Sequence, residues 1–394
     1  MPKKQTKSDK KSSATPRETN QRPLRILITG GGTGGHVFPA IAIADAVKRQ
    51  AADTEFLFVG ANGKMEMERV PKAGYTIEGL NIAGFQRSFS LKNLAFPYKL
   101  LSSLMKARSI LKRFRPDVVV GTGGYASGPV MRTAQRMGIP TIIQEQNSYA
   151  GVTNKLLAQG AAAVCVAYDH MEQFFPKENI IFTGNPVRQD IVQLDGKREE
   201  ALAYYGLDTH KKTIAIIGGS LGARTLNNAM RDNKALLAEQ ENIQVIWQCG
   251  RFYEYDFKDS EVAQLPNVQL RTFIDRMDLL YAAADVIISR AGALSISELC
   301  LVGKPVILVP SPNVAEDHQT KNALALVEKG AARLVRDAEA SEKMIKEALM
   351  ILENDALAFS LSEAIRPLGR PNAAETIARE VFCVATTGQH CEKD

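Results

Sequence analysis

The stretch RILITGGGTGGHVFPA (residues 25–40) joins an apolar run, a glycine-rich turn and the start of an apolar-periodic segment. A strand, a glycine turn and a helix in this order aim backbone N–H groups and the positive helix end at a phosphate. Two further glycine-rich segments follow strand-like runs, GTGGYASG at 121–128 and GGSLGA at 218–223. One such loop is weak evidence because many turns need glycine. Three of them indicate a protein that binds diphosphates.

Short β-branched runs alternate with helical patterns, which predicts parallel sheets with helices on both faces. The first series has strands at 25–29, 55–59, 117–120, 140–144, 162–166 and 180–183, and helices at 38–49, 64–71, 91–113, 127–137 and 150–158. The second has strands at 213–218, 243–247, 268–271, 285–288 and 305–309, and helices at 222–239, 277–283, 294–302 and 316–329. We therefore predict an α/β fold of two Rossmann-like domains facing each other across a cleft.

The chain divides into a basic tail at 1–22, a first domain at 23–183 and a second domain at 184–369. The tail holds seven Lys/Arg and two Asp/Glu, so it supplies most of the net charge of +6. The nearly neutral remainder argues against a nucleic-acid-binding body. The tail has the composition of a disordered segment and lacks the apolar core of a secretory signal. A transit peptide remains an alternative.

The chain has no run of about 18 apolar residues, so the sequence predicts no membrane-spanning helix. Its five cysteines show no paired spacing, and Cys165, Cys249 and Cys300 lie in apolar runs typical of reduced core thiols. This usage favours a cytoplasmic protein. The five histidines are scattered and no D-x-D occurs. We therefore expect no metal site and no cofactor.

His36 and the segment Glu145-Gln146-Asn147 are the candidate site residues of the first domain. His36 falls in the first turn of a helix, where the dipole disfavours the imidazolium. A neutral imidazole there suits a general base, but a structural histidine bonded to a backbone carbonyl is equally compatible. Glu145 and Asn147 follow a strand at its carboxyl end, where polar side chains line the ligand crevice. A turn or capping role for Asn147 stays open.

Polar residues of the second domain suit a diphosphate and a sugar. Ser220 in the third glycine loop and Arg188 across the cleft could hold a diphosphate, although Arg188 could equally form a surface ion pair. Ser295 and Glu298 fit the S-x-x-E capping box, a structural explanation for the glutamate. Alternatively, the Glu298 carboxylate accepts two hydrogen bonds from a ribose diol, each contributing about 1.5–3 kcal/mol. Spacing alone favours the cap.

The segment 84–108 interleaves aromatic and aliphatic side chains with cations, which suits a protein lying on an anionic membrane surface. The alternative is an amphipathic helix whose apolar face joins the core. The candidate membrane residues are Phe85, Phe89, Phe96, Lys92 and Lys99.

Six segments occur in order along the chain: GGTGGHVFPA (31–40), GTGGYASGP (121–129), EQNSYAGVTNK (145–155), TGNPVR (183–188), GGSLGARTLN (218–227) and SRAGALSISE (289–298). Together they resemble the MurG family of peripheral membrane glycosyltransferases, which make lipid II by adding N-acetylglucosamine to undecaprenyl-diphospho-N-acetylmuramoyl-pentapeptide (lipid I). The resemblance runs from about Arg25 to the C-terminal helix. It implies the GT-B fold, with a helix at about 370–394 crossing back onto the first domain.

The resemblance also implies where the substrates bind. Glu298 would bind the ribose hydroxyls of UDP-N-acetylglucosamine, the Ile274 backbone would contact uracil, and Ser220 with Arg188 would lie near the diphosphate. The other implied donor contacts are Thr33, Gly34, Gly35, Asn147, Ala293, Leu294, Ser295 and Gln319. The acceptor diphosphate would lie near the loop 33–36 and near Gly123, Gly124 and Tyr125.

The implied chemistry is an inverting displacement, in which a base removes the proton from the 4-hydroxyl of the acceptor and UDP leaves. His36 is the first choice for the base and Glu145 is the rival. The implied partners are UDP-N-acetylglucosamine, lipid I, the anionic inner-membrane surface and other proteins of cell-wall synthesis, with no nucleic acid. The implied location is the cytoplasmic face of the bacterial inner membrane.

Three other functions are compatible with parts of the sequence. A GT-B enzyme that glycosylates diacylglycerol would share the fold and the donor site. A nicotinamide oxidoreductase would need an acidic residue after the second strand, where this chain has Gly60-Ala61-Asn62. A non-catalytic scaffold of wall synthesis is the third, and a turnover assay distinguishes it.

Overall fold

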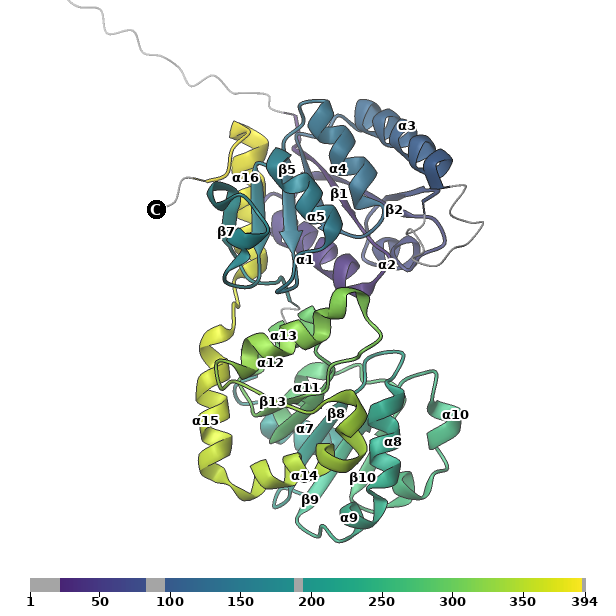
Figure 1. Cartoon of the computed structure of the whole chain (residues 1–394), viewed down its shortest axis with the longest axis vertical. Helices are drawn as coiled ribbons and strands as arrows, with labels where there is room; N and C mark the ends of the chain where they lie inside the picture. Colours follow the sequence, from purple (N-terminus) through teal and green to yellow (C-terminus); the bar gives the residue numbers. More distant parts are fainter. Residues whose placement is uncertain (1–21, 83–95, 188–193, 392–394) are drawn as a thin grey trace, which may run out of the picture.

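The computed structural model describes residues 22–82, 96–187 and 194–391, and these form two parallel sheets, one in each half of an elongated molecule (Figure 1). The first sheet has the strand order β3-β2-β1-β4-β5-β6-β7 and the second β10-β9-β8-β11-β12-β13. The expected α/β fold of two Rossmann-like domains is confirmed. The strands are β1 (Arg25–Gly30), β2 (Glu55–Ala61), β3 (Ile77–Leu80), β4 (Val118–Gly123), β5 (Thr141–Glu145), β6 (Ala163–Val166), β7 (Ile180–Phe182), β8 (Lys212–Ile217), β9 (Ile243–Gln248), β10 (Val268–Arg271), β11 (Val286–Ser289), β12 (Val306–Leu308) and β13 (Arg333–Leu334).

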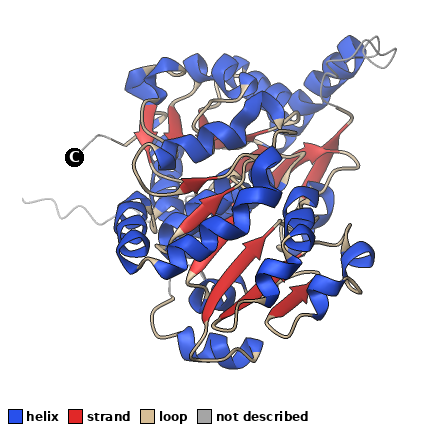
Figure 2. Ribbon diagram, turned by 60° about the horizontal axis from the view of Figure 1, so that its bottom comes forward, coloured by secondary structure: helices blue, strands red, loops and turns tan. Residues whose placement is uncertain are grey.

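Helices cover both faces of each sheet (Figure 2). Those of the first half are α1 (Gly34–Gln50), α2 (Glu66–Lys72), α3 (Phe96–Phe114), α4 (Ser127–Arg136) and α5 (Val152–Leu157). Those that follow are α7 (Arg198–Tyr205), α8 (Arg224–Asp232), α9 (Lys234–Ala238), α10 (Glu254–Phe257), α11 (Met277–Ala283), α12 (Ala293–Val302), α13 (His318–Val327), α14 (Ala340–Glu353), α15 (Asp355–Ile365) and α16 (Ala373–Thr387). Among the described helices, none combines the length and apolar character needed to cross a membrane.

In each sheet, the direction in which successive strands are added reverses once, beside the first strand of that sheet. β1 lies between β2 and β4, with Ile26 paired to Val118, and β8 lies between β9 and β11. Ligands of open α/β sheets bind at the carboxyl ends of the strands beside such a reversal. The glycine-rich loops follow β1, β4 and β8, and the segment 289–298 follows β11. The topology therefore gathers all four segments at the two reversal points.

The central strands are buried on both faces, which explains their continuous apolar runs. In β1, Ile26, Leu27 and Ile28 are fully buried, and they alternate between two core clusters on opposite faces of the sheet. α16 packs on α1 and places Ile377 and Val381 in the cluster that contains Ile26. The last helix of the chain therefore belongs to the core of the first half (Figure 1).

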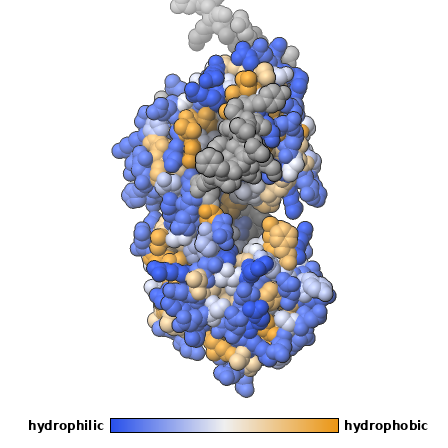
Figure 3. Space-filling model, turned by 45° about the vertical axis from the view of Figure 1, so that its right-hand side comes forward, coloured by the Kyte–Doolittle hydropathy of each residue, from blue (hydrophilic) through white to orange (hydrophobic). Residues whose placement is uncertain are grey.

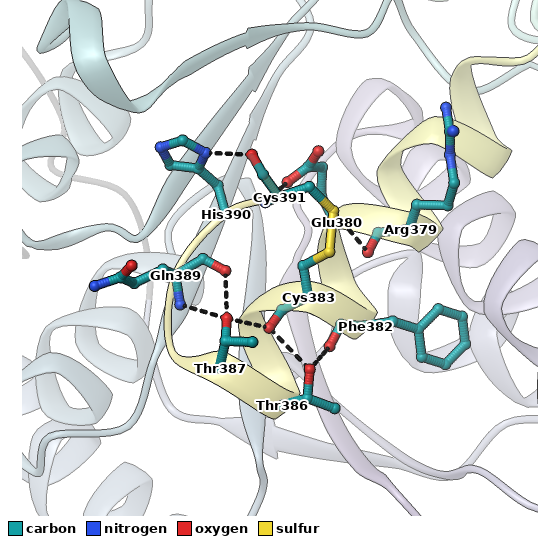
Figure 4. Close-up of a disulfide and its surroundings, with 9 residues drawn as sticks. All are labelled: Arg379, Glu380, Phe382, Cys383, Thr386, Thr387, Gln389, His390 and Cys391. Atoms are coloured by element: carbon teal, nitrogen blue, oxygen red, sulfur yellow. Dashed lines mark hydrogen bonds between the residues drawn. A yellow bond between two sulfur atoms is a disulfide. The ribbon is translucent and has the colours of Figure 1, made fainter. Parts of the chain in front are cut away.

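Two cysteines depart from the expected pattern, because Cys383 and Cys391 form a disulfide (Figure 4). α16 ends at Thr387 and is followed by Gly388, whose φ of +78° reverses the chain. The backbone N–H of Cys391 donates to Glu380 at 3.0 Å. The reversal brings Cys391 back to the helix, an effect that cysteine spacing does not reveal. Cys165, Cys249 and Cys300 are buried free thiols, as predicted.

Four short helices and strands and one helix break were not predicted. No sequence pattern indicated the edge strands β3 and β13 or the helices α7 and α10. β3 includes Glu78 and Gly79, and β13 has two residues. The expected helix at 222–239 is divided into α8 and α9. At the junction, the side-chain amide of Asn233 donates to the carbonyls of Ala229 (2.8 Å) and Ser341 (2.7 Å).

Candidate active site

The loops after β1 and β4 interlock at the reversal point of the first sheet. The N–H of Gly31 donates to the carbonyl of Gly123 at 3.2 Å. Gly124 has a φ of +88°, and a Cβ atom there would lie 3.0 Å from the Gly31 nitrogen. The two glycine loops therefore form one floor, which leaves no room for a side chain at position 124.

Substituting Gly124 with alanine should destabilise the protein by several kcal/mol, because a positive φ costs a residue with a Cβ about 1–3 kcal/mol and a backbone clash is added. Gly138→Ala is the matched control, since Gly138 has a φ of +72° and a Cβ added there would meet nothing within 4 Å. The difference between the melting temperatures of the two variants separates the effect of the clash from the effect of the positive φ. Equal melting temperatures for the two variants would contradict the interlocking of the loops.

His36 lies in the first turn of α1 with one ring nitrogen hydrogen-bonded. Its Nδ1 is 3.1 Å from the carbonyl oxygen of Gly31 and 3.2 Å from the Thr33 hydroxyl. Because a carbonyl can only accept, Nδ1 carries the proton, and the lone pair of Nε2 is available to accept one. A Cβ at Gly123, whose φ is +99°, would lie 3.0 Å from Nε2, so the imidazole faces the second glycine loop. Burial lowers the pKa of His36, although Glu145 and the Gly31 carbonyl oppose this.

Glu145 is buried beneath this floor and holds the following loop together. Its carboxylate accepts from the N–H of Asn147 (3.1 Å), the N–H of Gly151 (3.0 Å) and the amide of Asn154 (2.9 Å). The side-chain amide of Asn147 also donates to it at 3.2 Å. These bonds occupy both carboxylate oxygens, which leaves this residue poorly placed to take a proton from a substrate.

Of the loop residues expected at the acceptor diphosphate, Tyr125 is exposed, Gly124 is half-buried and Gly123 is buried. Tyr125 is 51% exposed, and a Cβ at Gly32 would lie 3.7 Å from its ring. The N–H groups in the first turn of α1, at Gly34 and Gly35, have no partner within the helix. Together with the N-cap residue Thr33, they present donors to an anion at the positive helix end.

The third glycine loop is built in the same way at the reversal point of the second sheet. Gly222, with a φ of +88°, lies against the turn after β9, where a Cβ would come 3.0 Å from the Cys249 carbonyl carbon. Ser220 is exposed at the tip of the loop, and its carbonyl accepts from the N–H of Arg251 at 3.3 Å. α8 starts directly behind the loop, at Arg224.

α12 begins beside this loop and carries the residues expected at the nucleotide. Its N-cap is Gly292 and it has no side-chain cap, so the capping-box interpretation of Ser295 and Glu298 is wrong. Both lie inside the helix, where the Tyr281 hydroxyl donates to Glu298 at 3.1 Å. Ala293 is buried at the first helical position and Leu294 is half-buried beside it. The side chain of Ile274, after β10, is buried.

α13 lies on the side of the second domain that faces the first domain (Figure 1). Gln319 accepts from the N–H groups of Ala291 (3.3 Å) and Ser311 (2.8 Å), tying together the loops after β11 and β12. Asn322 donates to the Asn147 side chain (3.2 Å) and accepts from the N–H of Ser148 (2.9 Å). The Asn147 side chain is therefore held at the interface between the domains, and the surface is hollowed between them (Figure 3).

The remaining predicted residues are only partly described. Arg188, Phe85, Phe89 and Lys92 lie outside the described residues, and Phe96 begins α3 with no described side-chain surroundings. Lys99 is exposed on α3. Among the described residues, no group of three or more His, Cys, Asp or Glu side chains could hold a metal ion.

Comparison with known proteins identifies the family. The glycosyltransferase family 28 N-terminal domain matches residues 26–166, and the family 28 C-terminal domain matches residues 213–377. An enzyme of Flavobacterium psychrophilum named UDP-N-acetylglucosamine--N-acetylmuramyl-(pentapeptide) pyrophosphoryl-undecaprenol N-acetylglucosamine transferase is 54% identical, over 91% of this chain and 97% of its own. An enzyme of the same name from Bacteroides fragilis is 56% identical, over 92% and 96%. The chain belongs to the MurG family of glycosyltransferases.

Solved structures agree with this membership. The crystal structure of Acinetobacter baumannii MurG matches with a TM-score of 0.74 and 30% identity, over 90% of this chain and 98% of that one. A UDP-GlcNAc 2-epimerase from Neisseria meningitidis matches with a TM-score of 0.64 at 15% identity, over 91% and 100%, which shows a shared fold only. The GT-B fold expected from the resemblance is therefore confirmed.

Sequence reasoning about this MurG-family chain missed two buried polar residues beside the candidate site. Glu66 accepts hydrogen bonds from the N–H groups of Gly32 and Ala61, each at 3.0 Å. Asn322 connects α13 to the loop after β5 in the first domain. Glu66 lies in a short charged helix and Asn322 inside an amphipathic one, so no local pattern separates them from ordinary helix residues.

Proposed function

We propose that this chain transfers N-acetylglucosamine from UDP-N-acetylglucosamine to the 4-hydroxyl of the muramoyl sugar of lipid I, producing lipid II and UDP with inversion. The observation that carries the proposal is the 54–56% identity to enzymes named for this transfer over nearly their whole length. The arrangement of the loops agrees with it, since His36 lies in the first domain and the α12 and α13 residues approach from the second.

We assign the donor to the second domain. Glu298 would accept hydrogen bonds from the ribose hydroxyls. The N-cap of α12 is Gly292, so the Glu298 carboxylate does not cap the helix. The Ile274 backbone, Ala293, Leu294 and Ser295 would surround the nucleotide. Ser220 and Arg188 would lie at the diphosphate, with Gln319, Asn147 and the loop 33–35 near the sugar.

We assign the acceptor to the first domain and the general base to His36. Nε2 would take the proton of the 4-hydroxyl as its oxygen attacks the anomeric carbon and the bond from that carbon to the UDP oxygen breaks. Two observations favour His36 over Glu145: the Nδ1 bond to the Gly31 carbonyl, and the four hydrogen bonds accepted by the buried Glu145. Loop N–H groups near Gly123, Gly124 and Tyr125 would contact the acceptor diphosphate.

We also propose that α3 lies against the cytoplasmic face of the inner membrane. Leu101 and Met105 are 57% and 60% exposed on this helix, and Lys99 and Arg108 are exposed beside them. The opposite face packs into the core through Ala107, Ile110 and Leu111. The core interpretation therefore applies to that face, and we propose the membrane interpretation for the exposed one. Anionic lipid would attract the cations and accommodate the apolar side chains.

The domain boundaries that we propose follow from the same division. The first domain comprises 23–183 together with the C-terminal segment at about 370–394, and the second comprises 184–369. Asn185, at the crossing between them, is buried and donates to the Gln146 carbonyl (2.9 Å) and to Ser297 (3.0 Å).

The pH dependence of kcat should reflect the pKa of His36. Burial lowers its pKa below the usual 6.5, so the neutral imidazole that can accept a proton persists to lower pH. We expect kcat to fall as the pH drops through a midpoint below 6.5 and to stay level above it. A midpoint above 6.5, or an unchanged acid limb in His36→Ala, would contradict this assignment.

Acceptor choice tests the proposed reaction against the diacylglycerol alternative. Labelled UDP-N-acetylglucosamine is incubated with a short-chain lipid I analogue or with diacylglycerol, and label in each lipid is counted. We expect transfer to the lipid I analogue alone. Label in diacylglycerol, with none in the lipid I analogue, would exclude the proposed acceptor.

A further inference from the structure

A buried carboxylate packs against the first glycine loop. Glu66, at the start of α2, is 1% exposed. Its Oε2 accepts from the N–H of Gly32 and its Oε1 from the N–H of Ala61, both at 3.0 Å. Glycines leave space for it, because a Cβ at Gly31 would come 3.0 Å from Oε2 and one at Gly60 would come 2.5 Å from its Cγ. The surroundings therefore fit a carboxylate at this position closely.

One peptide unit connects this carboxylate to His36. The N–H of Gly32 and the C=O of Gly31 belong to the same planar peptide, so fixing one end fixes the direction of the other. Glu66 holds the N–H end at 3.0 Å, and the C=O end accepts from His36 Nδ1 at 3.1 Å. Hydrogen bonds in such a chain polarise one another, and a charged acceptor strengthens the first of them.

We propose that Glu66 is a positioning residue for His36, which it orients through the Gly31–Gly32 peptide. The proposal rests on the proposed function of His36 as the base. The carboxylate makes the Gly31 carbonyl a better acceptor, which keeps the proton on Nδ1 and the lone pair on Nε2. Its negative charge also favours the imidazolium that forms when Nε2 takes a proton. A carboxylate bonded directly to a catalytic histidine acts in the same two ways.

Other ionisable groups also act on the imidazole. Glu145, the last residue of β5, and Glu66 both favour the imidazolium, whereas His318 at the start of α13 opposes it. His318 is itself 3.4 Å from the carboxylate of Glu316. Removing the charge of Glu66 leaves Glu145 as the remaining carboxylate acting on the ring directly, so the pKa of His36 should fall.

Glu66→Gln is the principal test. A glutamine retains the shape of the side chain but has only one acceptor oxygen. That oxygen can accept from one of the two N–H groups, and the NH2 group would face the second N–H. We expect kcat to fall about 10- to 100-fold, as for loss of other groups that orient a functional histidine. The KM for UDP-N-acetylglucosamine should change less than about twofold, and the acid limb of kcat should move to lower pH. Glu68→Gln is the matched control, since Glu68 is on the same helix but exposed and paired with Lys72.

A double-mutant cycle with His36→Ala identifies the route of the effect. If Glu66 acts through His36, Glu66→Gln should have no further effect on kcat in the His36→Ala background. Equal losses in both backgrounds, or a lowered melting temperature with unchanged kcat and acid limb, would overturn the positioning role alone. Wild-type kcat in His36→Ala would overturn the assignment of the base and the role of Glu66 with it. If Glu66→Gln does not accumulate as folded protein, Glu66→Asp, with its shorter reach to Gly32, enters the same cycle.

Discussion

Replacing His36 with alanine should lower kcat by roughly 10²–10⁴-fold, the usual contribution of general-base assistance. The KM for UDP-N-acetylglucosamine should change little, because the residues that we propose bind the donor lie mainly in the second domain. Truncation also leaves the Gly31 carbonyl without the Nδ1 bond, so unfolding must be followed alongside turnover. Steady-state kinetics with the lipid I analogue measure both parameters.

His36→Gln is the matched variant for this prediction. A glutamine amide can donate to the Gly31 carbonyl but cannot accept a proton at neutral pH, so it restores the contact without the base. We expect this variant to be as slow as His36→Ala with the stability of the wild type. Turnover near the wild-type value in His36→Gln would assign His36 a structural role.

Replacing Glu298 with alanine should raise the KM for UDP-N-acetylglucosamine by roughly 10- to 100-fold or more, because charge-assisted bonds to the ribose diol are each worth about 1.5–3 kcal/mol. The turnover number at saturating donor should fall much less. Measuring initial rates across donor concentrations at a fixed acceptor concentration separates the two parameters.

Glu298→Gln controls for the shape of the side chain and should give an intermediate KM, since the amide offers one acceptor oxygen. The structure places Glu298 six residues into α12, beyond the N-cap position, so neither variant should lose the stability of a helix cap. A normal donor KM in Glu298→Ala would remove this residue from the ribose site.

The strands that carry the site could be predicted because they are buried on both faces. β1, β4, β8 and β11 are continuous apolar runs, and three of them are followed by glycine-rich turns that parallel sheets and close backbone approaches require. The order of the strands could not be predicted from these runs. The order follows from the pairing of β1 with β4 and of β8 with β11. The first pairing brings together loops about 90 residues apart in the sequence, and the second brings together loops about 70 residues apart.

What the sequence did not reveal depends on contacts between distant residues. Glu66 acts on Gly32, 34 residues away, and Asn322 on Ser148, 174 residues away. Neither contact leaves a periodicity or a spacing motif. Ser295 and Glu298 are the opposite case, since they match a capping motif whose helix starts too early for it to operate. A local motif predicts a local contact only when the helix begins where the motif assumes.

The linkage in the lipid product is the most direct test of the proposed activity. Wild-type protein is incubated with UDP-N-acetylglucosamine and a lipid I analogue, and the purified product is examined by mass spectrometry and proton NMR. We predict one added N-acetylglucosamine, joined through a β linkage to the 4-hydroxyl of the muramoyl sugar. An α linkage, a different attachment position, or an unchanged acceptor in the presence of bound donor would contradict the proposed reaction.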